Sequence, residues 1–124
     1  MELKKTVLIV DDDARNIFAL AATLKAKGLD PVSCPGAAEA IRLLETDRPI
    51  DVVLLDMMMP DMDGYEALPR IKSLASRSGL PVIAVTAQAM PGDREKCLAA
   101  GADGYLAKPI DVDKLMNLLQ THMR

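Results

Sequence analysis

Short apolar runs that alternate with longer amphipathic stretches constrain the fold of this chain more than any other feature of its sequence. Four runs are distinct and a fifth, weaker run contains Pro31; together they cover residues 6–10, 30–34, 51–55, 81–85 and 104–107. Short runs of this kind, with few polar residues, are typical of parallel strands that are buried on both faces. Proline is tolerated in a strand mainly at the edge of a sheet, so we expect 30–34 to be an edge strand.

The stretches between and after these runs predict five helices. In the first, apolar residues recur at helical spacing from Ile17 to Leu24, and Gly28 follows where the helix would stop. Pro69 lies inside the third predicted helix, where it removes a backbone donor, so we expect a kink or a late helix start there. The other predictions are helices over 37–47, 64–75 and 91–100, and a last helix on which Val112, Leu115, Met116 and Leu119 share one face.

Five strands that alternate with five helices through short connections predict an α/β fold. We expect a flavodoxin-like (βα)5 three-layer sandwich, with a parallel five-stranded sheet in the order 2-1-3-4-5 and helices on both faces. A length of 124 residues suits one domain of ordinary size. We therefore expect residues 1–124 to form a single domain without an effector domain.

The composition argues against several classes of partner. A formal net charge of -3, an aromatic content of 2% and the absence of a basic run oppose binding to nucleic acid or to an anionic membrane. Lys4 and Lys5 precede an apolar run, but aspartates interrupt it after Val10, so a signal peptide is not expected. Cys34 and Cys97 are too few for a disulfide scaffold and lack metal-binding spacing. We expect a cytoplasmic protein.

Polar side chains follow the apolar runs. Asp11 and Asp12 follow the first run, and Asp56, Thr86 and Lys108 follow three later ones. Because parallel strands end at one edge of a sheet, we expect these side chains to gather where open α/β sheets place their sites. Clustered carboxylates suit Mg²⁺, and a carboxylate can attack phosphorus to form an acyl phosphate. A hydroxyl and an ammonium group would then neutralise the phosphoryl oxygens.

Four motifs in order resemble the receiver domains of two-component response regulators along essentially the whole chain. They are Val7-Leu8-Ile9-Val10-Asp11-Asp12-Asp13, Leu54-Leu55-Asp56-Met57-Met58-Met59-Pro60-Asp61-Met62-Asp63-Gly64, Val85-Thr86-Ala87 and Ala107-Lys108-Pro109. The resemblance implies a response regulator receiver in which Asp56 is the phosphoacceptor. It further implies that Asp11, Asp12, Asp56 and the backbone carbonyl of Met58 bind Mg²⁺, for which Mn²⁺ can substitute.

The same resemblance implies a switch. Thr86 would turn toward the phosphoryl group, Lys108 would pair with it, and Tyr105 would be the aromatic residue that swings inward on activation. The surface formed by the fourth helix, fifth strand and fifth helix would then change. The Lys108–Pro109 peptide is expected to be cis.

The segment from Gly92 to Gly101, together with Asn16, resembles receivers attached to hybrid histidine kinases and favours a phosphorelay. A histidine kinase or a histidine phosphotransfer protein is then the expected phosphodonor. His122, the one histidine of the chain, lies in the last predicted helix and is not expected to be the donor. The downstream partner is a protein whose identity the sequence does not specify.

Two other functions compete with this interpretation. A phosphatase that uses an aspartyl phosphate needs a second acid two residues after the nucleophile, and Met58 occupies that position, so we expect no enzyme that turns over substrates. A protein-interaction module that has lost the phosphoryl chemistry would not need Asp11, Asp12, Asp56, Thr86 and Lys108 together.

Several residues allow two interpretations. Asp13 is either a helix cap or neighbour of the metal site, or else a solvated acid. The methionines at 57–59 serve either packing or contact with a partner, because methionine suits both. Tyr105 could also be an ordinary aromatic of the core or surface. The segment 61–64 superficially resembles a calcium loop, but Met59 and Arg70 stand where acids are required.

Overall fold

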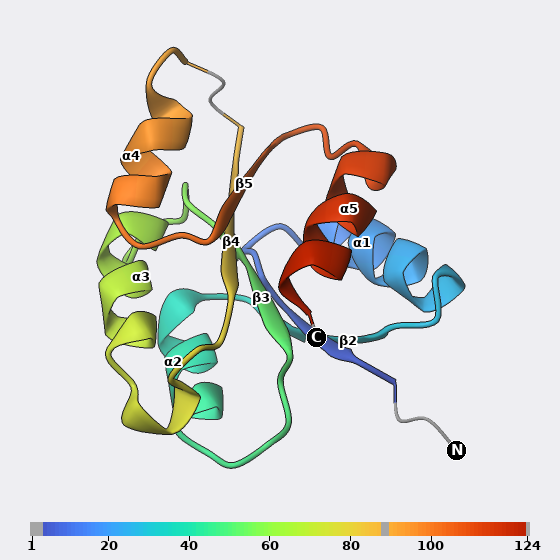
Figure 1. Cartoon of the computed structure of the whole chain (residues 1–124), viewed down its shortest axis with the longest axis horizontal. Helices are drawn as coiled ribbons and strands as arrows, with labels where there is room; N and C mark the ends of the chain where they lie inside the picture. Colours follow the sequence, from blue (N-terminus) through green and yellow to red (C-terminus); the bar gives the residue numbers. More distant parts are fainter. Residues whose placement is uncertain (1–3, 88–89, 124) are drawn as a thin grey trace.

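A parallel β-sheet forms the centre of the computed structural model, which describes residues 4–87 and 90–123 (Figure 1). The strand order is β2-β1-β3-β4-β5, and every neighbouring pair is parallel. The predicted flavodoxin-like order is confirmed, and the strand with Pro31 lies at one edge. The strands are β1 Thr6–Val10, β2 Asp30–Cys34, β3 Val52–Asp56, β4 Val82–Thr86 and β5 Gly104–Ala107.

Helices cover both faces of the sheet, so the architecture has three layers. In Figure 1, α1 and α5 lie on one side of the sheet and α2, α3 and α4 on the other. The helices are α1 Ala14–Ala26, α2 Ala37–Leu44, α3 Gly64–Lys72, α4 Asp93–Ala99 and α5 Val112–His122, with a 3-10 turn, η1, at Ala75–Arg77.

Three helices are shorter than predicted, for local reasons. The Thr46 hydroxyl donates to the carbonyl of Leu43, and the Ser73 hydroxyl donates to that of Arg70. These side chains occupy carbonyls at the ends of α2 and α3 and so compete with a further helical turn. Before α4, Gly92 has a φ of 90°, in the left-handed region, so Pro91 lies outside the helix.

Pro69 lies within α3, which begins at Gly64, so the predicted late helix start is wrong. Pro69 is exposed on the helix surface. The carbonyl of Tyr65, which loses its donor at this position, can therefore be hydrated from solvent. This exposure explains how the helix tolerates a proline in its interior.

Aspartate side chains cap three of the helices. Asp13 accepts a hydrogen bond from the Arg15 amide at 2.9 Å at the start of α1. Asp63 and Asp111 act in the same way at α3 and α5. Each carboxylate satisfies a backbone donor that has no partner within its helix. The helix-cap interpretation of Asp13 is therefore confirmed.

The sheet separates two apolar cores. Every residue of β1, β3 and β4 is buried, as expected for strands covered on both faces. The core on the α1–α5 side includes Ile9, Leu24, Leu54, Ile83, Leu115 and Leu119, and the core on the α2–α3–α4 side includes Leu8, Leu44, Leu55, Met57, Leu68 and Ile71.

Gly64, at the start of α3, has no room for a side chain. A Cβ atom there would lie 2.3 Å from Sδ and 2.7 Å from Cα of Met57. The amide of Gly64 also donates to the carbonyl of Met57 at 3.2 Å, which closes the loop after β3. A side chain at this position would push the loop away from α3.

We expect Gly64→Ala to lower the free energy of unfolding by about 1–3 kcal/mol, because the added methyl group meets backbone atoms that cannot move freely. Urea unfolding followed by circular dichroism would measure the change. Gly36→Ala is the matched control: its Cβ would meet only the mobile carboxylate of Glu39, at 3.1 Å. Its expected cost is below about 1 kcal/mol. Equal losses in both variants would contradict the steric argument.

Candidate functional site

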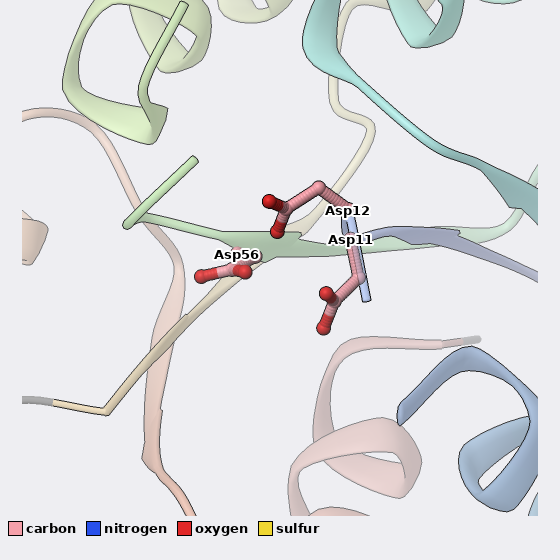
Figure 2. A group of neighbouring side chains, drawn as sticks. All are labelled: Asp11, Asp12 and Asp56. Carbon is pink, nitrogen blue, oxygen red and sulfur yellow. The ribbon is translucent and has the colours of Figure 1, made fainter. Parts of the chain in front are cut away.

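Three carboxylates meet at the carboxyl edge of the sheet. Asp11 follows β1 and Asp56 ends β3, and these strands are neighbours with Val10 opposite Leu55. One carboxylate oxygen each from Asp11, Asp12 and Asp56 lies within 4.8 Å of the others (Figure 2). The predicted convergence of the three acids is therefore present in the structure.

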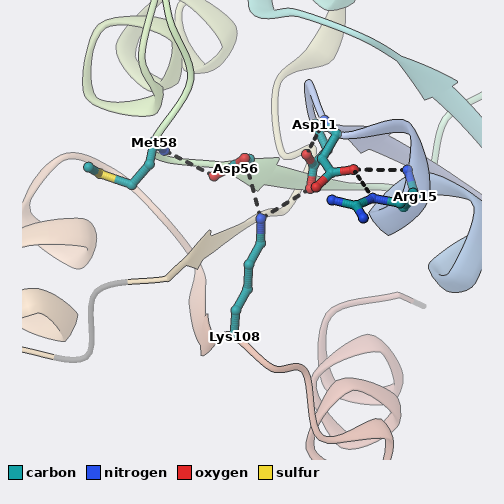
Figure 3. A network of polar contacts seen from close by, with 6 residues as sticks. Asp11, Arg15, Asp56, Met58 and Lys108 are labelled. Carbon is teal, nitrogen blue, oxygen red and sulfur yellow. Dashed lines mark hydrogen bonds and ion pairs between the residues drawn. The ribbon is translucent and has the colours of Figure 1, made fainter.

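Lys108 approaches this acidic cluster from the end of β5. Its Nζ lies 3.3 Å from Oδ2 of Asp11 and 3.4 Å from Oδ2 of Asp56 (Figure 3). Its backbone amide donates to the carbonyl of Thr86 at 2.8 Å, which extends the pairing of β5 with β4. The Lys108–Pro109 peptide bond is cis, as the resemblance implied. Lys108 thus links the ends of three strands.

Backbone amides orient the two buried carboxylates. The amide of Asp13 donates to Oδ1 of Asp11 at 2.8 Å, and the amide of Met58 donates to Oδ1 of Asp56 at 3.0 Å (Figure 3). In both side chains the other oxygen, Oδ2, faces Lys108. Each carboxylate is therefore held by one neutral donor and one cation.

The electrostatics of the cluster are unbalanced. Asp11 and Asp56 are buried, with 6% and 4% of their surface exposed, whereas Asp12 is exposed. Burial raises the pKa of Asp56 above its usual value, and the Met58 amide and Lys108 only partly offset this effect. Burial alone would lower the pKa of Lys108, but the nearby charges of Asp56 and Asp11 raise it. The one ammonium group contacts two of the three carboxyl groups of the cluster.

This donor set fits a hard divalent cation. Mg²⁺ prefers carboxylate and carbonyl oxygens and retains several waters, so an edge with one exposed acid suits it. Two buried carboxylates and one exposed carboxylate within 4.8 Å supply the oxygens. The excess of negative charge favours the binding of a cation at this site.

Thr86 and Tyr105 lie on the two remaining strands of this half of the sheet, β4 and β5. Thr86 ends β4 and has only 2% of its surface exposed. Tyr105 is half-buried in β5 and packs against the core on the α2–α3–α4 side. Burial raises the pKa of Tyr105, and so do Asp93 and Cys97 of α4. The tyrosine side chain therefore faces α4, and its role as an activation switch stays a prediction.

The three methionines that follow Asp56 differ in exposure. Met57 is fully buried and Met59 is 7% exposed, whereas Met58 is 48% exposed beside the acidic cluster. The first and third methionines therefore serve packing. The middle one leaves its side chain available at the rim of the site.

Sequence reasoning missed a set of contacts on α3 and α4. Nζ of Lys96 lies 4.3 Å from the centre of the Tyr65 ring, and the Tyr65 hydroxyl lies 3.6 Å from Sγ of Cys97. Tyr65 lies on α3 and Cys97 on α4, 32 positions apart in the sequence, so no local pattern marks the contact. At the opposite edge of the sheet, Asp51 accepts a hydrogen bond from the Thr6 amide.

The profile of the response regulator receiver domain family matches residues 7–120. The chain belongs to this family. It is 42% identical over 118 residues to the histidine-protein kinase BarA of Escherichia coli K12, an alignment that covers 95% of the chain but 13% of BarA. It is 31% identical to the response regulator DivK of Brucella anthropi, with 98% of each chain covered. The chain thus spans about an eighth of the kinase and nearly all of DivK.

Solved structures of receivers have the same fold. The receiver domain of the sensor histidine kinase PA1611 of Pseudomonas aeruginosa PAO1 matches with a TM-score of 0.87 and 35% identity, over 97% of this chain and 98% of that one. That structure has a magnesium ion coordinated in its active-site cleft. The predicted similarity to receivers of histidine kinases is confirmed. Within residues 4–87 and 90–123, no helix has the length and apolar content needed to cross a bilayer.

The raised pKa of Asp56 predicts how its charge affects stability. A carboxyl group with a higher pKa in the folded than in the unfolded protein binds its proton more tightly when folded. Its contribution to stability is present below the unfolded pKa, about 4, and is lost as the pH rises through the folded pKa. At neutral pH, the ionised Asp56 therefore destabilises the metal-free protein.

We expect Asp56→Asn to raise the urea midpoint at pH 7 in the presence of a chelator, with an advantage that shrinks toward pH 4. Added Mg²⁺ should raise the midpoint of the wild type more than that of the variant, because a ligand stabilises the state that binds it. Asp61→Asn is the control, since Asp61 is exposed and its φ of 67° suits asparagine. A variant less stable than the wild type at pH 7 would refute the electrostatic argument.

Proposed function

We propose that this chain is a phosphoaccepting switch in which Asp56 receives a phosphoryl group from a phosphohistidine in a Mg²⁺-dependent reaction. The observation that carries the proposal is the position of Asp56, buried at the end of β3, contacted by Lys108 and within 4.8 Å of two further acids. A histidine kinase or a histidine phosphotransfer protein would be the donor. The similarity to BarA and to the receiver of PA1611 supports this class of partner.

The proposed transfer uses the carboxylate of Asp56 as the nucleophile. A carboxylate oxygen forms a bond to phosphorus while the P–N bond of the phosphohistidine breaks, and the imidazole leaves. The Met58 amide holds Oδ1 and so limits rotation of the carboxylate. Lys108, 3.4 Å from Oδ2, supplies positive charge for the phosphoryl oxygens. The hydroxyl of Thr86 would donate to the same oxygens.

Asp11, Asp12 and Asp56, with the backbone carbonyl of Met58, are the residues that we propose hold Mg²⁺ or Mn²⁺. A bound divalent cation supplies charge neutralisation for the phosphoryl group. The excess of three carboxylates over one ammonium group in the acidic cluster supports this assignment. Asp12 would be the ligand most accessible to solvent, because it is exposed whereas the other two acids are buried.

The signal would leave through the surface formed by α4, β5 and α5. A phosphoryl group adds negative charge and acceptor oxygens at Asp56, which would draw the Thr86 hydroxyl toward it. Tyr105, which packs against the α4 side, would then move into the space released. Protein contact with this surface, or onward transfer of the phosphoryl group, would carry the output.

We infer that the chain promotes its own phosphorylation and slow dephosphorylation but does not turn over external substrates. No acid stands two residues after Asp56, where Met58 exposes an apolar side chain beside the acidic cluster. A receiver spanning residues 1–124 and a cytoplasmic location belong to the same proposal. The two free, buried cysteines suit a reducing compartment.

Incubation with acetyl phosphate should label the wild type once, as an 80-Da mass increase that requires Mg²⁺ (the mass of one added HPO₃ is about 80 Da). We expect Asp56→Asn and addition of a chelator each to abolish the label. Asp61→Asn, an exposed acid in the loop that follows, should be labelled like the wild type. Intact-protein mass spectrometry would measure all three. A label that persists in Asp56→Asn would rule out the proposed phosphoacceptor.

Thr86→Ala should separate phosphorylation from switching. The variant keeps Asp56 and Lys108, so we expect acetyl phosphate to label it, although more slowly. The NMR shift of the Tyr105 ring on phosphorylation should be lost, because no hydroxyl is drawn to the phosphoryl group. Thr86→Ser, which retains the hydroxyl, should restore the shift. An unchanged response of Tyr105 in Thr86→Ala would contradict the role given to Thr86.

A further inference from the structure

A cleft between α1 and α5 opens beside the acidic cluster. It has a volume of about 230 Å³ and reaches from the apolar face of the sheet, at Ile9 and Leu54, to Asp11, Asp56 and Lys108 at its rim. Figure 1 shows α1 and α5 side by side on this face of the sheet. The cleft therefore joins an apolar interior to the charged site, and the function proposed above makes no use of the apolar part.

Residues of α1 and of the segment that leads into α5 line this cleft. On α1, Ala19 and Thr23 lie one turn apart and line the cleft, and opposite them it is lined by Val112 at the start of α5 and by Ile110 just before that helix. Leu119 of α5 belongs to the core on this side of the sheet and is fully buried. The cleft thus extends along α1 from Asn16 to Thr23, and along the first turns of α5 at Val112 and Leu115.

The volume of the cleft limits the size of the ligand that it can bind. A cavity of about 150 Å³ lined by aliphatic side chains is enough to bind benzene, whereas sites for drug-sized ligands begin at about 300 Å³. A cleft of about 230 Å³ therefore accommodates one ring with a short arm. An α-helix, about 10–12 Å across with its side chains, is too large to enter it.

The charge at the rim of the cleft favours a ligand of positive charge. Asp11 and Asp56 share the single ammonium group of Lys108, at 3.3 and 3.4 Å, and all three residues line the cleft, so carboxylates outnumber the ammonium group at its rim. Asn16 lines the same rim and offers an amide. An ammonium or amidinium group is attracted to this excess of negative charge, and a carboxylate is repelled by it.

We propose that this cleft binds a small organic cation, with one apolar ring or branched chain between α1 and α5 and its ammonium group at Asp11 and Asp56. Because that group would take the place of a metal ion beside the same carboxylates, binding of the amine and binding of Mg²⁺ exclude one another. The cleft is thus a ligand site through which an amine controls the occupancy of the acidic cluster. Binding does not depend on Asp56 accepting a phosphoryl group, so it can fail or succeed independently of the proposed function.

Titration of the full chain with 2-phenylethylamine, followed by the methyl resonances of Leu20, Ile110 and Leu115, would test the proposal. We expect saturable shifts with a Kd on the order of 1 mM, as for a ligand of about nine heavy atoms. The uncharged 2-phenylethanol should bind several-fold more weakly, and the anionic 3-phenylpropionate should not saturate. Added Mg²⁺ should raise the apparent Kd of the amine. Equal binding of the amine and the anion would overturn the proposal. So would an amine Kd that Mg²⁺ leaves unchanged at a concentration at which Mg²⁺ itself shifts the resonances of the acidic cluster; if Mg²⁺ causes no such shift, the proposed metal site fails instead, and the comparison of amine and anion decides the cleft.

A matched pair of variants tests the location of the cleft. Thr23→Leu would fill it, and Thr121→Leu makes the same change on the surface of α5; in both, the threonine hydroxyl donates to a carbonyl four residues earlier in its own helix. We expect at least a ten-fold loss of amine affinity in Thr23→Leu only. An equal affinity in the two variants would exclude the cleft. The comparison of amine, alcohol and anion in the wild type decides the proposal if Thr23→Leu does not fold.

Discussion

The parallel pairing of β1 with β3 is the constraint on which the rest of this structure depends. Its register sets Val10 opposite Leu55, so the residues that follow, Asp11 and Asp56, reach the same edge from sequence positions far apart. A shift of one residue would turn the side chains of a strand to the opposite face. The buried positions of both strands hold this register in place, because every one of them is packed against a covering helix layer.

That pairing brings carboxylates close enough to repel one another, and the positive charge of Lys108 offsets this repulsion only in part. Two buried carboxylates repel each other, and burial in addition disfavours the charged form of Asp56. The ammonium group of Lys108 contacts both of them, and the amides of Asp13 and Met58 each satisfy one oxygen. The site is therefore organised before any ligand binds. The apolar cores on both faces of the sheet offset the destabilising effect of placing these carboxylates close together.

Much of this arrangement could be read from local patterns, because strand ends and helix caps are local features. The five apolar runs correspond to the five strands, and Gly28 follows the end of α1 as expected. The ends of helices were less predictable. The hydroxyls of Thr46 and Ser73 take up helix carbonyls, and this competition depends on side-chain rotamers that hydrophobic periodicity does not describe. Pro69 is tolerated within α3 because it faces solvent.

The sequence by itself determined the fold class, the strand order and the set of polar residues at the strand ends. Hydrophobic periodicity and the residues that follow each strand are properties of short segments, so they can be recognised without knowledge of the tertiary structure. Only the tertiary structure decided how those residues are arranged. It assigned burial to Asp11 and Asp56 but exposure to Asp12, and it placed Lys108 between the two buried acids. It also turned Tyr105 toward α4 and left the cleft between α1 and α5 open. These features depend on how separate elements pack together, which no single segment of the chain encodes.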